Sequence, residues 1–165
     1  LHLANLTADN AQILALDIYP AKLDELRKRC YRNGIQSVQT ASVENETVLN
    51  GIKKMADGIL IDAPCSGLGV LKRNPDAKWN ITPERLEEIL EVQKNILQTY
   101  APMVKKGGTL VYATCSILPL ENQLQVSHFL GSELGDLFEL EKEHTYFSHE
   151  TGFDGFYCAR MIRKM

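Results

Sequence analysis

Three short apolar runs, each ending in a polar or reactive side chain, constrain this fold more than any other feature of the sequence. The runs are AQILALD (11–17), GILIDAP (58–64) and GTLVYATC (108–115). Strands that are apolar throughout are typical of sheets buried on both faces, and strands that alternate with helices indicate a parallel, doubly wound sheet. The sequence therefore predicts an α/β fold with a mostly parallel sheet.

The segments between and after these runs supply the expected helices and the remaining strands. Pro20 and Asn33-Gly34 are typical start and stop signals of a helix over residues 20–34. Thr82 and Pro83 begin a long helix that is expected to reach about Val104, where Lys105 to Gly108 would stop it. The remaining predicted elements are a weaker strand SVQTAS (37–42), a helix over 121–131, and two last strands, LFELEKE (137–143) and FYCARMIR (156–163). Because only the turn-rich TGFDG and no helix separates the last two strands, they are expected to form an antiparallel pair at the sheet edge.

Composition indicates one ordinary globular domain. The chain has 165 residues, of which 44% are hydrophobic and 24% charged, and no apolar run is long enough for a membrane span. The net charge of −3 means that any binding of nucleic acid would depend on a local basic patch or on a further domain. The four cysteines form no C-x-x-C pair and the histidines are scattered, so we expect no metal site and reduced thiols in the cytoplasm.

Polar side chains fall at the carboxyl ends of the predicted strands, where α/β folds bind their ligands. Asp17 either accepts hydrogen bonds from ribose hydroxyls or merely caps the helix that begins at Pro20. Asp62 ends the next confident strand, and Cys65 follows it in a turn that Ser66 and Gly67 make tight.

Two runs of the sequence are especially rich in residues that could take part in chemistry, and each contains a cysteine. These runs are IDAPCSGLGVLKRNPDAKW (61–79) and VYATCSILPLENQ (111–123). A single cysteine at a strand end is usually a small buried core residue, but two thiols just past neighbouring parallel strands could both reach a cleft and act as nucleophiles. Lys72, Arg73 and Lys78 give the first run local positive charge beside Trp79, although the same loop could simply be solvated.

These two runs closely resemble the RNA 5-methylcytosine methyltransferases of the Sun (Fmu) family. TGFDGFYCARMIR (151–163) resembles the closing strand pair of that family, and the likeness covers nearly the whole chain in matching order. The resemblance implies the Rossmann-like fold of S-adenosylmethionine-dependent methyltransferases, with S-adenosylmethionine as cofactor and RNA as substrate. It implies no metal and leaves the oligomeric state open.

The resemblance also implies a role for each matching residue. Cys115 would add to carbon 6 of cytosine, Cys65 would assist release of the methylated RNA, and Asp62 would contact the cytosine edge. Asp17 would bind the cofactor ribose, with Asp62 and Pro64 also in the cofactor site. Lys72 or Arg73 would hold the RNA backbone.

Two departures from the family pattern carry their own expectations. The glycine-rich cofactor loop and the first strand are expected immediately before Leu1, so we expect this chain alone to bind S-adenosylmethionine weakly. Ser42 stands where family members usually carry a cofactor-contacting Asp, and Glu44 is a possible substitute.

The sequence therefore predicts the catalytic part of an RNA cytosine-5 methyltransferase, with ribosomal RNA preferred to transfer RNA as substrate. The alternative is a non-catalytic RNA-binding or assembly module of the same descent. A DNA or small-molecule methyltransferase is disfavoured because such an enzyme does not need the cysteine of the TCS motif.

Overall fold

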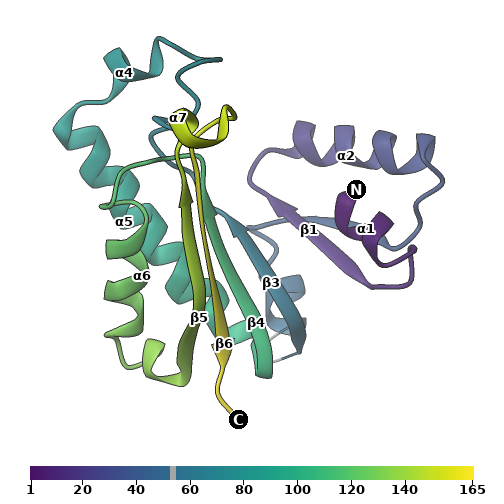
Figure 1. Ribbon diagram of the computed structural model, residues 1–165. Coiled ribbons are helices and arrows are strands. Elements are labelled where there is room, and N and C mark those ends of the chain that lie inside the picture. The colour runs from purple at the N-terminus through teal and green to yellow at the C-terminus, as the bar shows by residue number, and fades with distance from the viewer. Residues whose placement is uncertain (53–54) are drawn as a thin grey trace. The chain divides into compact units, whose positions relative to one another are not determined.

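The computed structural model describes residues 1–52 and 55–165, which divide into two compact units (Figure 1). The first unit comprises Leu1–Ile52, and the second comprises the rest of the described chain. That the two units belong to one domain, as the sequence predicts, stays a prediction. None of the helices within the described residues is long and apolar enough to cross a bilayer.

The first unit contains a parallel pair of strands and three helices. Its elements are α1 (His2–Leu6), β1 (Ile13–Asp17), α2 (Pro20–Arg32), β2 (Val38–Ser42) and α3 (Glu46–Gly51). Leu23 and Cys30 are the buried side chains of α2, which packs on both strands. The two predicted strands and the predicted helix between them are confirmed, whereas α1 and α3 were not predicted.

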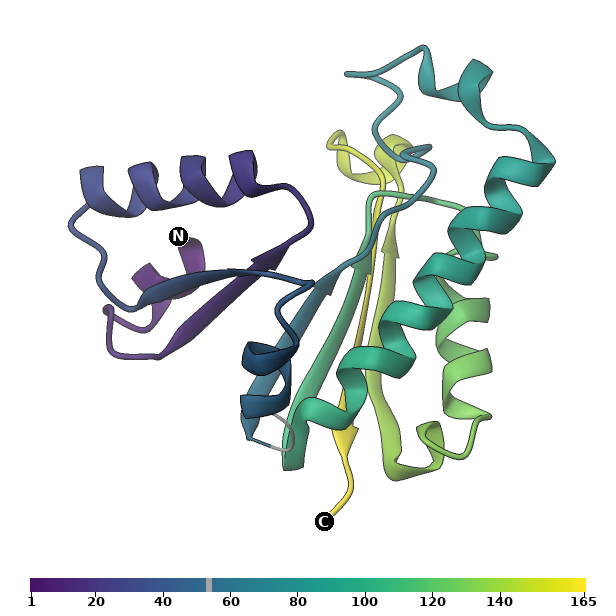
Figure 2. The same ribbon diagram turned by 180° about the vertical axis from the view of Figure 1, so that it is seen from behind.

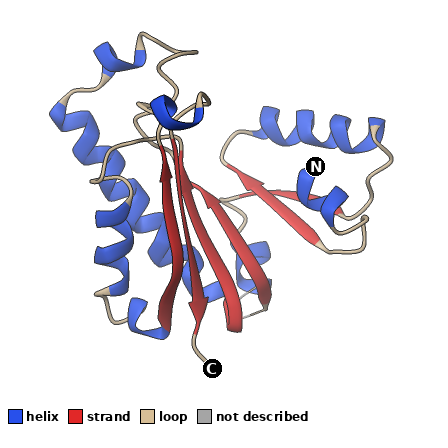
Figure 3. Ribbon diagram, viewed as in Figure 1, coloured by secondary structure: helices blue, strands red, loops and turns tan. Residues whose placement is uncertain are grey.

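The second unit is built on a four-stranded sheet. Its elements are β3 (Ala56–Asp62), α4 (Ala77–Asn80), α5 (Pro83–Tyr100), a 3-10 turn (Ala101–Met103), β4 (Val104–Thr114), α6 (Gln123–Leu130), a second 3-10 turn (Gly135–Leu137), β5 (Phe138–Tyr146), α7 (Ser148–Thr151) and β6 (Phe156–Arg163). The strand order is β3-β4-β6-β5, and β6 alone runs against the other three (Figure 3). The antiparallel pairing of the last two strands is thus confirmed, and β6 lies between β4 and β5.

The long helix α5 starts as predicted but ends early. Thr82 Oγ1 accepts a hydrogen bond from the Arg85 N–H at 3.2 Å, which confirms the predicted cap. The helix ends at Tyr100 and not near Val104, because Pro102 has no N–H and cannot donate the backbone hydrogen bond that would continue the helix. The segment Lys105 to Gly108, expected to stop a helix, instead lies within β4.

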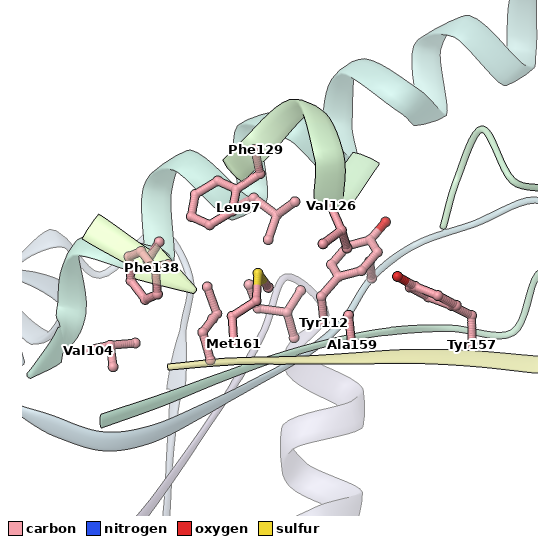
Figure 4. Close-up of a cluster of buried hydrophobic side chains, with 13 residues drawn as sticks. Leu97, Val104, Tyr112, Val126, Phe129, Phe138, Tyr157, Ala159 and Met161 are labelled. Atoms are coloured by element: carbon pink, nitrogen blue, oxygen red, sulfur yellow. The ribbon is translucent and has the colours of Figure 1, made fainter. Parts of the chain in front are cut away.

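The core of the second unit lies between the sheet and the helices α5 and α6, which cover one face of it (Figure 2). Side chains from β4 and β6 point toward these helices (Figure 4), and the labelled members of the cluster are Leu97, Val104, Tyr112, Val126, Phe129, Phe138, Tyr157, Ala159 and Met161. The rings of Tyr112 and Tyr157 meet edge to face, with their centroids 6.4 Å apart. This packing fixes β3 and β4 side by side, and with them the loops that leave their carboxyl ends.

Candidate active site

The two thiols singled out by the sequence meet at the carboxyl ends of β3 and β4. Asp62 is the last residue of β3 and lies opposite Ala113 of β4, and Ala63 continues the pairing with a 2.9 Å hydrogen bond to the Ala113 carbonyl. Cys115 directly follows β4, and its Sγ lies 3.2 Å from the Sγ of Cys65. The predicted proximity of the two cysteines is therefore confirmed.

The close contact between the two sulfur atoms shifts the pKa values of the two thiols in opposite directions. A hydrogen bond from Cys65 lowers the pKa of the Cys115 thiol to about 7, although burial and the charge of Asp62 act in the opposite direction. The same hydrogen bond, burial and the Cys115 charge raise the pKa of the Cys65 thiol far above its usual range. The two thiols are therefore expected to titrate as a pair, with the first proton lost near neutral pH and the second held firmly.

Both cysteines begin the same four-residue turn. Cys65-Ser66-Gly67-Leu68 and Cys115-Ser116-Ile117-Leu118 share the pattern Cys-Ser-x-Leu. In each turn the serine hydroxyl accepts a hydrogen bond from the leucine N–H two residues later, at 3.3 Å from Leu68 and 3.1 Å from Leu118. A side chain that bonds the backbone two residues on stabilises a local turn, so the serine after each cysteine helps to fix the loop that leaves the strand.

A buried polar network holds the turn after β4. Asn122 accepts a hydrogen bond from Thr114 Oγ1 at 2.6 Å and donates one to the Ser116 carbonyl at 2.9 Å, so it binds the chain on both sides of Cys115. The buried polar residues here are Ser66, Gln93, Thr114, Ser116, Glu121 and Asn122. The sequence pattern placed Ser66 in a tight turn but indicated no role for the other five. The available signals were the repeated Cys-Ser-x-Leu pattern and a Glu-Asn pair that closes the apolar stretch after Ser116.

Two glycines bring a third segment against the site. The Gly69 N–H donates to the Cys115 carbonyl at 2.9 Å, and the Gly155 N–H donates to the Gly69 carbonyl at 2.7 Å. A Cβ atom on Gly69 would lie 2.2 Å from the Gly155 carbonyl oxygen, so the three backbones fit only without a side chain there. The turn before β6 thus packs directly on the loop that carries Cys65.

The basic loop after Cys65 is exposed, and one of its two predicted phosphate-binding residues is paired. Lys72 is exposed, whereas the Arg73 guanidinium lies 2.6 Å from an Asp154 carboxylate oxygen. Trp79 in α4 is 77% exposed, and Lys78 Nζ lies 4.9 Å from the centroid of its ring. The loop therefore presents a cation and an aromatic plane to solvent.

Asp17, the predicted ribose-binding residue, lies in the first unit at the carboxyl end of β1. Its Oδ1 accepts the Tyr19 N–H at 2.8 Å, as a local cap would, and its Oδ2 lies 3.6 Å from Lys22 Nζ. Ser42 pairs with Asp17 across the strands and accepts the Glu44 N–H at 3.2 Å. Because Asp17 and the thiols belong to different units, its place in a common site stays a prediction, as do the roles of Ser42 and Glu44.

Asp62 and Pro64 are both exposed at the end of β3. The Pro64 carbonyl accepts a hydrogen bond from Gln93 Nε2 at 2.9 Å, which ties this exit from the strand to α5. Within residues 1–52 and 55–165, no three His, Cys, Asp or Glu side chains gather as metal ligands would.

Comparison with known proteins connects this arrangement to a family of RNA methyltransferases. The probable ribosomal RNA small subunit methyltransferase B of Synechocystis sp. is 41% identical over 132 residues, which cover 78% of this chain and 29% of that protein. The ribosomal RNA small subunit methyltransferase B of Proteus mirabilis is 36% identical over 157 residues, which cover 95% of this chain and 37% of that protein. The chain thus spans less than two fifths of the length of these curated relatives.

Solved structures agree in fold. The structure of NSun6 from Pyrococcus horikoshii with SFG matches 99% of this chain and 44% of that one, with a TM-score of 0.85 and 25% identity. A methyltransferase homologue from Pyrococcus horikoshii matches 99% of this chain and 57% of that one, with a TM-score of 0.80 and 26% identity. These matches confirm the Rossmann-like methyltransferase fold that the sequence resemblance implies.

The family model described as "16S rRNA methyltransferase RsmB/F" matches residues 1–162, which is nearly the whole chain. This match, together with the two curated relatives, confirms the resemblance carried by the two cysteine motifs. The chain belongs to the RsmB/F family of 16S rRNA methyltransferases.

Proposed function

We propose that the protein methylates carbon 5 of a cytosine in small-subunit ribosomal RNA through a covalent bond to Cys115. The observation that carries the proposal is the 3.2 Å separation of the Cys65 and Cys115 Sγ atoms at neighbouring strand ends. One thiol would suffice for nucleophilic attack, so a second thiol in contact with it supports a reaction in which both take part.

Cys115 is the proposed nucleophile. Carbon 5 of cytosine is a weak nucleophile, and addition of a thiolate to carbon 6 shifts electron density toward it. Because the pKa of Cys115 is lowered to about 7, a large fraction of this side chain is thiolate at neutral pH. S-Adenosylmethionine, when bound, supplies the methyl group that carbon 5 accepts.

Cys65 is proposed to assist release of the product. Its S–H group hydrogen-bonds the Cys115 thiolate before attack, and that charge raises the pKa of Cys65. Once Cys115 is bonded to carbon its charge is gone, so the pKa of Cys65 falls. Cys65 can then lose its S–H proton to solvent, and the resulting thiolate can accept the carbon-5 proton. The electron pair of that C–H bond re-forms the ring double bond, and the bond from carbon 6 to Cys115 breaks.

The remaining predicted residues fit binding roles in this proposal. A carboxylate can accept about four hydrogen bonds, and Asp17 uses one oxygen to cap the Tyr19 N–H, so its other oxygen could accept ribose hydroxyls of the cofactor. Asp62 and Pro64, exposed beside the thiols, are proposed to contact the cytosine edge and the cofactor. Lys72 and Arg73 are proposed to hold RNA phosphates, with Arg73 the weaker because Asp154 already pairs with it.

The test uses the purified full-length protein with small-subunit ribosomal RNA and labelled S-adenosylmethionine. Cys115→Ala is expected to abolish both methylation and any denaturation-resistant complex with RNA. Cys65→Ala is expected to permit attack and methyl transfer but to leave the RNA attached, so the complex accumulates on a denaturing gel. Cys158→Ala, at a half-buried thiol of β6, is the matched control and should behave like the wild type.

Other outcomes would change the proposal in defined ways. A complex that accumulates with Cys115→Ala and not with Cys65→Ala would reverse the two roles. Methylation of transfer RNA alone would move the substrate to that class. A full-length wild-type protein that methylates neither RNA would favour a non-catalytic RNA-binding or assembly module. Because the reaction needs both thiols reduced, we expect it in a reducing compartment such as the cytoplasm.

A further inference from the structure

Glu121 is a fully buried carboxylate in the loop between β4 and α6. Acidic side chains are almost never fully buried unless donors surround them, because desolvation of the charge costs several kcal/mol. A buried Glu beside two reactive thiols is therefore a feature whose contacts need an explanation.

The contacts of Glu121 come from both cysteine turns. Its Oε1 accepts the Ser66 N–H at 2.7 Å and Gln93 Nε2 at 3.1 Å. Its Oε2 accepts the Ser66 hydroxyl at 2.6 Å and also the Ser116 hydroxyl. These four donors fill the acceptor capacity of the carboxylate.

The two serines directly follow the two cysteines. Ser66 and Ser116 are 50 residues apart in sequence, yet both hydroxyls donate to the same oxygen atom, so their relative position is fixed by one side chain. Gln93 extends the bridge to α5, because its amide also binds the Pro64 carbonyl at 2.9 Å. The turn that carries Cys65 is thus held at Pro64 and at Ser66, on both sides of the thiol.

The charge of Glu121 does not itself favour the thiolate. Its negative charge is one of the influences that raise the pKa of Cys115, along with burial and Asp62. A carboxylate at this position is therefore better explained by the four hydrogen bonds it can accept than by the effect of its charge on the thiols. It can take donors from two loops at once, which an apolar side chain of the same size cannot.

We propose that Glu121 is a positioning residue that joins the two Cys-Ser-x-Leu turns and holds the Cys65 and Cys115 side chains in contact. The proposal deepens the proposed function and rests on it for its catalytic meaning. The juxtaposition of the thiols, however, can be measured without RNA or cofactor.

The central measurement is the rate at which diamide closes a Cys65–Cys115 disulfide in the folded protein. The two thiols lose two protons and two electrons, the sulfurs bond, and the N=N bond of diamide is reduced to a hydrazine. Glu121→Gln removes the charge and one acceptor oxygen but keeps the size of the side chain, and we expect it to slow closure at least tenfold. Peptide mass spectrometry identifies the pair that closes.

The matched control is Tyr157→Phe. The Tyr157 hydroxyl also donates a hydrogen bond to a carboxylate, that of the exposed Glu143, and this bond involves neither Cys-Ser-x-Leu turn. We expect this variant to close the disulfide at the wild-type rate even if its melting temperature falls as much as that of Glu121→Gln. If Glu121→Gln does not fold, Ser116→Ala removes one arm of the bridge and is expected to slow closure severalfold.

A methylation assay then distinguishes the positioning role of Glu121 from the proposed methyltransferase function. We expect Glu121→Gln to lower kcat with little change in KM for RNA, in proportion to the slower closure. Closure at the wild-type rate in Glu121→Gln, or equal slowing in Tyr157→Phe, would overturn the positioning role whatever the activity. Slow closure in Glu121→Gln, with a full-length wild-type protein that does not methylate RNA, would sustain the positioning role and reject the proposed function.

Discussion

Replacement of Cys65 by alanine should make the Cys115 thiol less acidic. In the structure the hydrogen bond from Cys65 is the main cause that lowers the pKa of Cys115 to about 7. Burial and the charge of Asp62 both raise it, and they stay in place in Cys65→Ala. We therefore expect the pKa of Cys115 in this variant to return at least to the ordinary thiol value of about 8.5.

The expected change in the alkylation rate of Cys115 depends on pH. At pH 7 the thiolate fraction should fall from about half to about 3%, a roughly 16-fold change. Thiolates of higher pKa are better nucleophiles, with a Brønsted coefficient of about 0.4–0.5, so each remaining thiolate should react about fivefold faster. The net alkylation rate should therefore fall only about threefold at pH 7 and rise about fivefold above pH 10, where both forms are ionised.

The assay is pulsed alkylation with iodoacetamide across a pH series, followed by mass spectrometry of the Cys115 peptide. The two rate curves should cross, and the midpoint for Cys115 should move upward by about 1.5 pH units in Cys65→Ala. Cys158→Ala removes a thiol that does not pair with Cys115 and should leave the midpoint in place. An unchanged or lower midpoint in Cys65→Ala would refute the argument that the thiol pair activates Cys115.

Three further variants test other parts of the site. Gly69→Ala places a Cβ atom 2.2 Å from the Gly155 carbonyl oxygen and should lower the free energy of unfolding by about 1–3 kcal/mol in denaturant melts. Gly58→Ala is the control, because its Cβ would come no closer than 3.9 Å to Thr109, and it should have a much smaller effect. Trp79→Ala removes an aromatic plane that is 77% exposed and should weaken RNA binding by about 1–3 kcal/mol if a base stacks there, as measured by fluorescence titration; unchanged affinity would remove Trp79 from the RNA surface. Lys72→Ala should reduce the salt dependence of RNA binding by about one unit of log–log slope, and an unaltered slope would show that this lysine contacts no phosphate.

The strands could be predicted because each depends on residues that are close in sequence, and the thiol contact could be predicted because it follows from the pairing of two of these strands. Apolar runs that end at Asp17, Asp62 and Cys115 identified β1, β3 and β4 and the edge at which their side chains emerge. Once β3 and β4 are neighbours and parallel, the cysteines that follow them have to be near each other. The apolar pattern of the strands and the parallel pairing of β3 with β4 were together enough to predict the thiol contact.

The remaining features depend on contacts that the sequence pattern does not contain. The end of α5 was misplaced because the glycines after Lys106 were given more weight than Pro102, which breaks the helix. The role of Glu121 could not be predicted because its donor Ser66 lies 55 residues away. The neighbouring backbones that exclude a side chain at Gly69 likewise come from a distant segment.

The direction of β6 has a practical consequence for work on this protein. Since β6 alone runs against the other strands of its sheet, it starts beside Gly155, at the end of the sheet where the thiols lie. It leaves Met165 at the opposite end of the sheet (Figure 1). Met165 is 92% exposed. A fluorophore or surface tether attached at residue 165 would therefore leave the end of the sheet with Cys65 and Cys115 open to a large RNA, so binding could be followed on an immobilised sample.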